Sequence, residues 1–207
     1  MRKPGALDGE PILYVAAGMG EIYDSIDAKL EQWIGQQQMF FVATAPDRGG
    51  HVNVSPKGPI ESLRVLDPHT VAYLDLVGSG IETVAHLRQN GRICLMLCAF
   101  QGPPRIVRLH GQGEAFPSGS EEFAALSERF DRSDVPASAC ASRSLVRIEV
   151  ERIADSCGFD VPLMEYSGVR PQRMAWVETK LAKDGENALV EYVETRNAVS
   201  IDGLPGI

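Results

Sequence analysis

The chain has 207 residues, of which 44% are hydrophobic, so it is long enough to bury the core of one domain. Its 20 basic and 28 acidic side chains give a formal net charge of −8, which argues against binding to nucleic acids or to anionic membrane surfaces. No apolar run approaches the ~18 residues of a membrane helix, and none of signal-peptide length follows the basic residues at positions 1–4. A single domain in the cytoplasm is therefore expected.

The cysteines argue against a metal site. Cys94, Cys98, Cys140 and Cys157 are scattered, with no C-x-x-C pair and no histidine at the spacing of a zinc finger. Cys94 and Cys98 would point to one face of a strand, where small apolar side chains are common, so we interpret both as buried. The four histidines are dispersed along the chain, so neither a metal cluster nor a catalytic triad is predicted.

The predicted elements form a helical start, a β-rich middle and a helical end. Residues 21–38 carry Ile22, Ile26, Leu30, Trp33 and Ile34 at helical spacing and predict an amphipathic helix. Alternating or apolar runs then predict strands at 39–45, 51–56, 62–67, 71–78, 92–100, 105–116 and 144–155, joined mainly by tight turns. Short helices are expected after residue 79 and at 120–130, and two more at 171–183 and 186–199.

Many short antiparallel strands with few helices indicate a mainly β (α+β) domain. Closing the sheet, or nearly closing it, removes the exposed edges that invite aggregation, so we predict an antiparallel barrel of six to seven strands with peripheral helices. Its core would span about 36–155, and a helical C-terminal extension would span about 156–207.

The first candidate for chemistry is the abrupt strand end at residues 55–59, SPKGP. Two prolines around a glycine fix the backbone and leave amide and carbonyl groups free to face a ligand. Lys57 would stand there as a fixed cation. The alternative interpretation is an ordinary strand end with a solvated lysine.

The second candidate is a strand that runs into Gly78-Ser79-Gly80 and then into a helix. Glycines let the backbone approach a ligand, and a helix N-terminus offers free N–H groups to a phosphate, with Ser79 and Thr83 as added hydroxyl donors. No lysine follows the last glycine, so the segment is not a nucleoside triphosphate loop. The alternative is an ordinary strand-to-helix turn.

Together, these two segments resemble the pyridoxamine 5'-phosphate oxidase-like split-barrel flavoproteins. The resemblance rests on the hairpin, on 55–58 (SPKG), 73–75 (YLD), 78–80 (GSG), the short helix, 90–92 (NGR) and the apolar strand after it, and it spans roughly 36–155. It implies a homodimeric split β-barrel with FMN at the subunit interface and a small-molecule substrate. The residues that it assigns to the cofactor fall into three groups: Asn53, Val54, Ser55, Pro56 and Lys57 along the flavin ring; Tyr73, Leu74 and Asp75 beside the ring and ribityl chain; and Ser79, Gly80, Ile81, Glu82 and Thr83 around the phosphate.

Lys57 would then favour the reduced, anionic flavin, since nearby protein charges tune a cofactor's electronics. The chain departs from the family's vitamin enzymes at two places: Gly80-Ile81 stand where those enzymes have an Arg-Lys pair, and their C-terminal tryptophan and Arg-Leu signature is missing. Pyridoxamine phosphate oxidation itself is therefore not expected. Arg105 and Arg108, on the strand at 105–116, could reach the phosphate across the dimer and compensate, and the alternative interpretation is that they are surface arginines of that strand. A deazaflavin or haem in the same groove is an alternative cofactor, and a ligand-binding module without catalysis is the alternative function.

Overall fold

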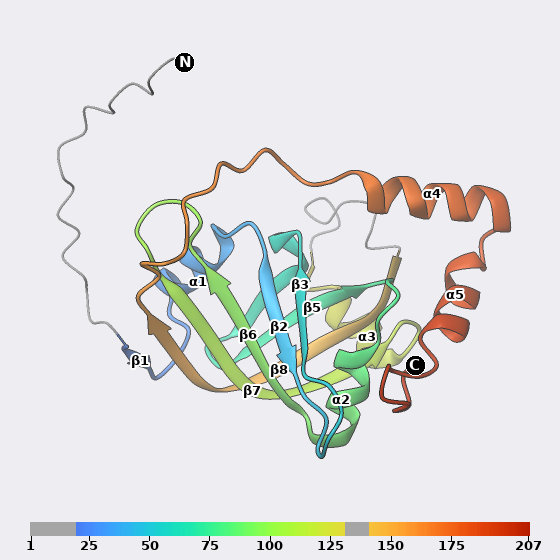
Figure 1. Ribbon diagram of the computed structural model, residues 1–207, viewed down its shortest axis with the longest axis horizontal. Coiled ribbons are helices and arrows are strands. Elements are labelled where there is room, and N and C mark those ends of the chain that lie inside the picture. Colours follow the sequence, from blue (N-terminus) through green and yellow to red (C-terminus); the bar gives the residue numbers. More distant parts are fainter. Residues whose placement is uncertain (1–19, 131–140) are drawn as a thin grey trace.

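A single antiparallel β-sheet forms the centre of the molecule in the computed structural model, which describes residues 20–130 and 141–207 (Figure 1). The strands are β1 (Ile22–Tyr23), β2 (Phe40–Thr44), β3 (Asn53–Lys57), β4 (Leu63–Asp67), β5 (Thr70–Leu76), β6 (Arg92–Cys98), β7 (Ile106–Pro117) and β8 (Ser142–Ser156). Their order is β3-β2-β6-β7-β8-β5-β4, and β1 pairs with β8. The sheet curls into a split barrel but is not closed, because β3 and β4 end it without pairing with each other.

Each predicted hairpin is present as an antiparallel pair: β2 with β3, β4 with β5, and β6 with β7. The helices are α1 (Ala28–Gly35), α2 (Glu82–Asn90), α3 (Glu121–Ser127), α4 (Gln172–Asp184) and α5 (Ala188–Arg196), with a 3-10 turn η1 (Ile60–Ser62). Gly91 ends α2 in the left-handed conformation, at φ 67°, which glycine adopts without strain. Ser120 caps α3 by accepting a hydrogen bond from the backbone N–H of Phe123.

The prediction of one helix over 21–38 was wrong in its extent. The helix begins only at Ala28, because the carboxylate of Asp27 accepts a hydrogen bond from the backbone N–H of Leu30 at 2.7 Å and so caps the first turn. The residues before it form β1, where Ile22 and Tyr23 pair with the end of β8. The helical spacing of Ile22 is therefore incidental, and its side chain is exposed.

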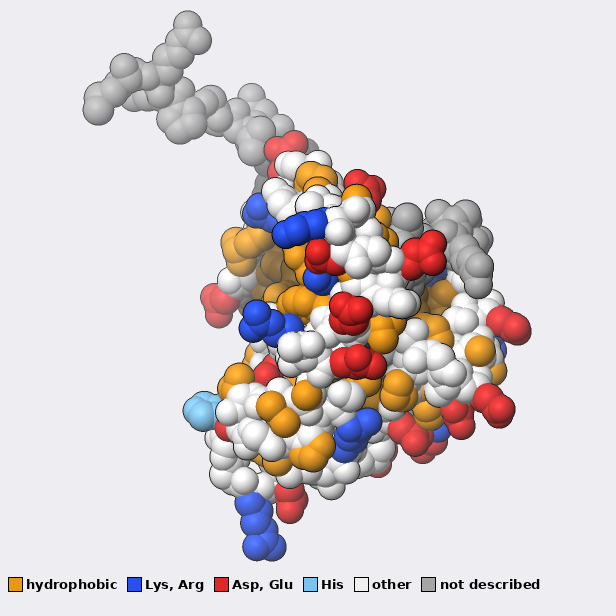
Figure 2. All heavy atoms as spheres, turned by 90° about the vertical axis from the view of Figure 1, so that its right-hand side faces the viewer, with side chains coloured by type: hydrophobic (Ala, Val, Ile, Leu, Met, Phe, Trp, Pro, Cys, Tyr) orange, Lys and Arg blue, Asp and Glu red, His pale blue; other side chains and the backbone are white. Residues whose placement is uncertain are grey.

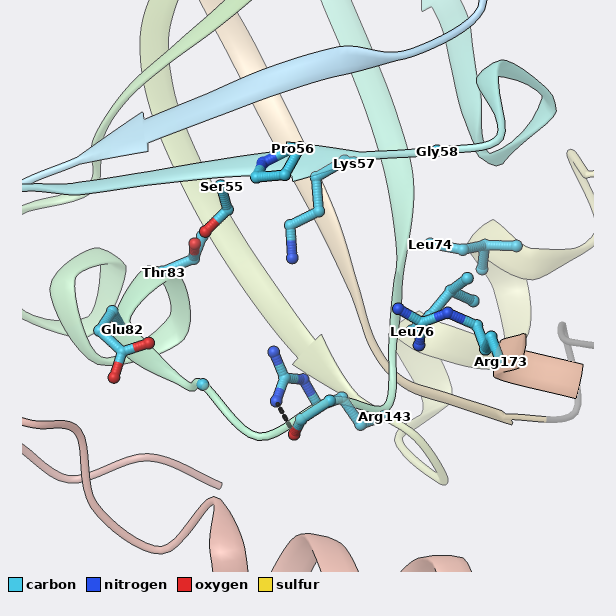
Figure 3. A pocket seen from close by; sticks show the side chains of 12 residues that line it. Ser55, Pro56, Lys57, Gly58, Leu74, Leu76, Glu82, Thr83, Arg143 and Arg173 are labelled. Carbon is cyan, nitrogen blue, oxygen red and sulfur yellow. Dashed lines mark hydrogen bonds between the residues drawn. The ribbon is translucent and has the colours of Figure 1, made fainter. Parts of the chain in front are cut away.

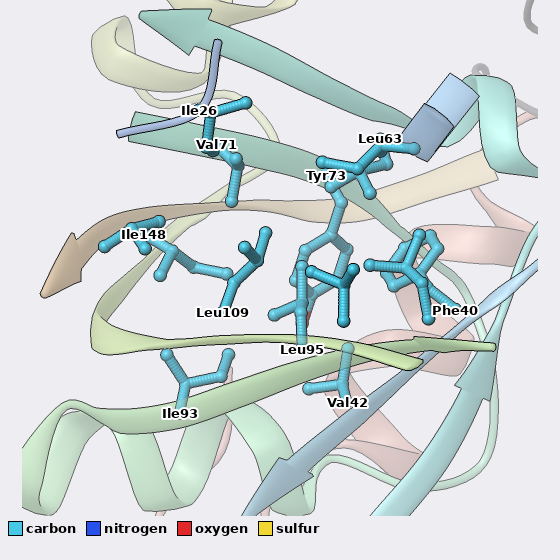
Figure 4. Packing of buried hydrophobic residues seen from close by; sticks show 14 of the residues in the cluster. Ile26, Phe40, Val42, Leu63, Val71, Tyr73, Ile93, Leu95, Leu109 and Ile148 are labelled. Carbon is cyan, nitrogen blue, oxygen red and sulfur yellow. The ribbon is translucent and has the colours of Figure 1, made fainter. Parts of the chain in front are cut away.

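The main core fills the interior of the barrel with alternate side chains of its strands (Figure 4). Phe40 and Tyr73 meet edge to face with ring centroids 5.5 Å apart, and Leu95 and Leu109 lie opposite each other on the paired strands β6 and β7. All four side chains are fully buried. This packing makes the strands the rigid part of the molecule from which neighbouring loops are positioned.

The C-terminal extension runs from β8 to α4 and α5, which lie beside the barrel at the end of β5 (Figure 1). Val177 of α4 and Leu189 of α5 form a small buried cluster with Ala141, next to β8. The last residues return to the barrel, where Asn197 is fully buried and donates hydrogen bonds to the carbonyls of Gly78 and Ser79. Within 20–130 and 141–207, no helix is both long and apolar enough to cross a membrane.

Candidate functional site

A pocket of about 240 Å³ opens where the end of β3 faces β5, the turn before α2 and the first turn of α4 (Figure 3). Its lining residues are Ser55, Pro56, Lys57, Gly58, Leu74, Leu76, Gly78, Gly80, Glu82, Thr83, Arg143 and Arg173. Both segments that the sequence analysis singled out therefore contribute to one pocket.

Beneath the pocket, a buried carboxylate holds two cations in place. Asp75, on β5, is fully buried, and its carboxylate accepts hydrogen bonds from Lys57 Nζ at 2.6 Å and from Arg143 Nε at 2.8 Å. Lys57 comes from β3 and Arg143 from β8, so three strands meet at this ion pair. The side chain of Lys57 is only 18% exposed, so it is not the solvated lysine of the alternative interpretation.

The two cations keep Asp75 ionised. Burial alone would raise the pKa of the Asp75 carboxyl, but the charges and hydrogen bonds of Lys57 and Arg143 outweigh it and lower the pKa below its ordinary value. Truncating either partner would leave a buried charge with fewer compensating groups, which is costly. The triad therefore fixes the Lys57 ammonium and the Arg143 guanidinium at the pocket wall.

Arg143 and Arg173 are pocket residues that the sequence analysis missed. Arg143 also donates from one terminal nitrogen to the carbonyl of Gly78 and to Oδ1 of Asn197, while Arg173 donates to the carbonyl of Val77. Both residues lie far from β3 and β5 in sequence and reach the pocket only through pairing of β8 with β5 and through the position of α4. No spacing rule in the sequence links them to the Gly78-Ser79-Gly80 turn.

A chain of side-chain hydrogen bonds leads from the pocket to the buried His86 of α2. Asn53 Nδ2 donates to Thr83 Oγ1 at 3.0 Å and to Thr44 Oγ1 at 3.3 Å, and Ser55 donates to Asn53 Oδ1 at 2.8 Å. Thr44 in turn contacts Nδ1 of the buried His86. Because Thr83 accepts from Asn53, its own hydroxyl proton is available to a ligand in the pocket.

A second, shallower hollow of about 410 Å³ adjoins the pocket and shares Gly80 and Glu82 with it. It is otherwise lined by His51, Val52, Asn53, Val54, Ser79 and Ile201. The Glu82 carboxylate accepts a hydrogen bond from the backbone N–H of Ile201 and lies against Gly80, between the two hollows. A phosphate bound at Gly80 would therefore meet this carboxylate unless Glu82 turned away.

Most of the residues assigned by resemblance line one of these two hollows. They are Ser55, Pro56, Lys57, Leu74, Gly80, Glu82 and Thr83 in the pocket, and Asn53, Val54 and Ser79 in the hollow. Tyr73 and Ile81 are instead packed in the interior, and Asp75 acts from beneath the pocket. Arg105 lies elsewhere in the chain: its guanidinium stacks on Trp33 and pairs with Asp155, so a role across a subunit interface stays a prediction.

The cysteines and histidines form no metal site in the part of the chain that the structure describes. Burial raises the pKa values of the Cys94 and Cys98 thiols, which disfavours the reactive thiolate. Cys98 is buried as predicted, Cys94 is half-buried, and Cys140 lies outside the described residues.

The fold is that of a split-barrel protein, with a pocket beside the edge strand β3. Residues 26–157 match the family model described as pyridoxamine 5'-phosphate oxidase. The chain is also 37% identical over 195 residues to the pyridoxamine 5'-phosphate oxidase family protein ustO of Aspergillus flavus, an alignment that covers 89% of this chain and 77% of that protein. The chain belongs to the pyridoxamine 5'-phosphate oxidase family.

Solved structures with a similar chain path are more distant. HupZ of Group A Streptococcus matches with a TM-score of 0.48 and 23% identity, covering 62% of this chain and 91% of that one. A FAD binding protein of Mycobacterium smegmatis matches with a TM-score of 0.43 and 14% identity, covering 63% and 94%.

Proposed function

We propose that the chain is an FMN-binding oxidoreductase that transfers hydride or electrons between the flavin and a small molecule. The observation that carries this proposal is the pocket itself, which brings the strand end at Lys57, the Leu74 side of β5 and the turn at Gly80 together around one cavity. Family membership supports the same reading, because the segments that meet there are those on which the resemblance to the flavoproteins rests.

The lining fits a flavin mononucleotide in two respects. Pro56, Leu74 and Leu76 offer an apolar surface of the kind that a flat ring requires. At the other end, the Thr83 hydroxyl and the N-terminus of α2 offer hydrogen-bond donors to a phosphate. No histidine lines this pocket among the described residues, whereas His51 lines the adjoining hollow.

When bound, a flavin supplies the hydride or electron transfer, and the protein supplies orientation and electrostatics. Lys57 would lie at the ring, with its charge partly balanced by Asp75 at 2.6 Å. The Asp75 contact holds the ammonium at the wall, so Lys57 would present a positioned donor to the ring rather than an uncompensated charge. The Asn53 network would hold the Thr83 hydroxyl toward the phosphate.

We further propose that a second copy of the chain completes the site. A cofactor pocket usually has a volume of roughly 300–1,000 Å³, and the pocket in one chain, at about 240 Å³, is smaller than that. The adjoining hollow is open and carries the exposed side chains of Val52, Val54 and Ile201. A partner subunit would cover these side chains and enclose the flavin.

The first test is uptake of FMN and its dependence on Thr83. Freshly purified or FMN-reconstituted protein should show the visible absorption bands of a bound flavin. Thr83→Ala should lower the affinity for FMN by about tenfold or more, because a hydrogen bond to a charged acceptor contributes roughly 1.5–3 kcal/mol. Riboflavin, which lacks the phosphate, should hardly respond to the substitution.

Fluorescence titration of both ligands against both proteins measures these affinities. Equal losses for FMN and riboflavin would place the phosphate away from Thr83. A colourless protein that takes up no added FMN would contradict the flavoprotein proposal and favour the non-catalytic module.

A further inference from the structure

The pocket concentrates positive charge in an acidic protein. Lys57, Arg143 and Arg173 contribute three cations to its lining, against two carboxylates, those of Asp75 beneath it and Glu82 at its rim. The whole chain carries a net charge of −8, and acidic side chains are spread over the face that α4 and α5 form (Figure 2). A local excess of cations in such a chain indicates that the pocket takes an anion.

Two arginines have donors left for that anion. Arg143 is 5% exposed and uses Nε and one terminal nitrogen on Asp75, Gly78 and Asn197, while its other terminal nitrogen makes no hydrogen bond to the described residues. Arg173 lines the pocket, is exposed, and donates to the Val77 carbonyl from one terminal nitrogen, while its other N–H groups make no hydrogen bond to the described residues. Arginine suits a carboxylate or phosphate because its planar fork can donate two parallel hydrogen bonds.

Arg173 does not coincide with the phosphate end of the proposed flavin site, whereas Arg143 bonds to the carbonyl of Gly78 in the turn before α2. Figure 3 shows Thr83 and Ser55 at one side of the pocket, and Arg173 at the other beside Leu74 and Leu76. If the flavin phosphate lies at Thr83, the guanidinium of Arg173 is left for a second anionic group near the apolar wall. That combination of an apolar wall and an arginine fits an organic acid.

We propose that Arg173, with Arg143, binds the acid group of a small organic-acid substrate whose apolar part packs against Leu74 and Leu76. The assignment rests on the proposed function and adds the class of substrate to it. It also gives the C-terminal extension a role in specificity, because α4 supplies Arg173 and Asn197 holds Arg143 from the other side.

Benzoate, an aromatic acid, and benzamide, its neutral counterpart, are suitable probes. Calorimetric titration of the FMN-loaded protein should show binding of benzoate in preference to benzamide. Arg173→Gln should lower the affinity for benzoate by about tenfold or more. Arg173→Lys, which keeps the charge but loses the fork, should recover part of the loss. Arg170→Gln is the matched control, because Arg170 is an exposed arginine three residues away and outside the pocket lining.

The outcomes separate this inference from the proposed function. Benzamide binding as tightly as benzoate, or benzoate affinity unchanged in Arg173→Gln, would overturn the acid site. If Arg173→Gln lowers the affinity for FMN but not for riboflavin, the arginine holds the cofactor's phosphate, and the substrate assignment is wrong. If the protein takes up no FMN, the proposed function fails, while the same benzoate titrations on the flavin-free protein still test the arginines. Thermal melting of each variant checks that a lost signal is not lost folding.

Discussion

At the scale of single residues, Asp75 connects the barrel to the pocket. Its buried carboxylate accepts hydrogen bonds from Lys57 and Arg143, which belong to different strands, and Ser144 lies within 3.4 Å of it. The resemblance placed Asp75 beside the ring and ribityl chain, but its side chain is fully buried and acts by fixing the two cations. A change at Asp75 should therefore affect both stability and ligand binding.

The lowered pKa of Asp75 predicts a pH dependence of stability. A carboxyl whose pKa is lower in the folded than in the unfolded chain stabilises the fold above its unfolded pKa, about 3.9 for aspartate, and this contribution is lost as the pH falls through the folded pKa. Asp75→Asn should lower the free energy of unfolding at neutral pH and flatten its decline below about pH 4. Urea unfolding between pH 7 and pH 3 measures both effects.

Asp160→Asn is the control for that experiment, since Asp160 is exposed and makes no ion pair among the described residues. It should leave the neutral-pH stability within about 0.5 kcal/mol of the wild type. A parallel pH curve for Asp75→Asn and the wild type would show that Asp75 is not the group responsible.

The sequence could predict the local part of this site but not the part that is assembled by the fold. Lys57 and Thr83 were found because a rigid strand end and a glycine-rich turn have recognisable chemistry. Arg143 and Arg173 were missed because an arginine on a strand or in a helix is most often solvated. Their role depends on β8 pairing beside β5 and on the return of the chain at α4, which no short-range pattern encodes.

At the scale of the elements, the strands followed their predicted positions within a few residues, because apolar alternation and turn residues act locally. The helix predicted over 21–38 was wrong at its start, because Asp27 lies inside the pattern and caps the helix there. The prediction of a nearly closed barrel gave the right fold but not the eighth strand, since a two-residue strand such as β1 carries no periodicity.

The long pair β7 and β8 depends on a glycine at its bulge. The register shifts between His110 and Gly111, and a Cβ added at Gly111 would overlap the carbonyl oxygen of Glu149 on β8. Gly111→Ala must therefore push the strands apart and should lower the free energy of unfolding by about 1–3 kcal/mol. Gly35→Ala, at the end of α1 where nothing lies within 4 Å of the added Cβ, should leave stability unchanged or slightly raised.

Thermal or urea unfolding of both variants tests the role of the bulge. Equal stability of Gly111→Ala and the wild type would mean that the strand pair relaxes without cost. If Gly35→Ala loses as much free energy of unfolding as Gly111→Ala, the close approach of Glu149 to Gly111 does not explain the effect.

At the scale of the whole molecule, the sheet presents a partly exposed apolar row on the face opposite its core. Val54 of β3 pairs with Ala43 of β2, and Ala43 pairs on its other side with Cys94 of β6. The next row joins Pro56 to Phe41 and Met96 in the same way. Contiguous apolar surface of this kind is typical of a protein interface, and it adjoins the hollow where we expect a second copy to enclose the flavin.

The last prediction is that these rows form the interface of a homodimer. Light scattering at micromolar concentration should give about twice the 22.5 kDa mass of the chain. Val54→Asp should shift the protein toward the mass of one chain, because burying an unpaired carboxylate in an apolar interface is unfavourable, and FMN should bind more weakly as a result. Val190→Asp makes the same change at an exposed valine of α5, away from β3, and should leave the dimer intact. A wild-type protein with the mass of one chain would remove the partner from the proposed site, and an intact dimer in Val54→Asp would place the interface on another face.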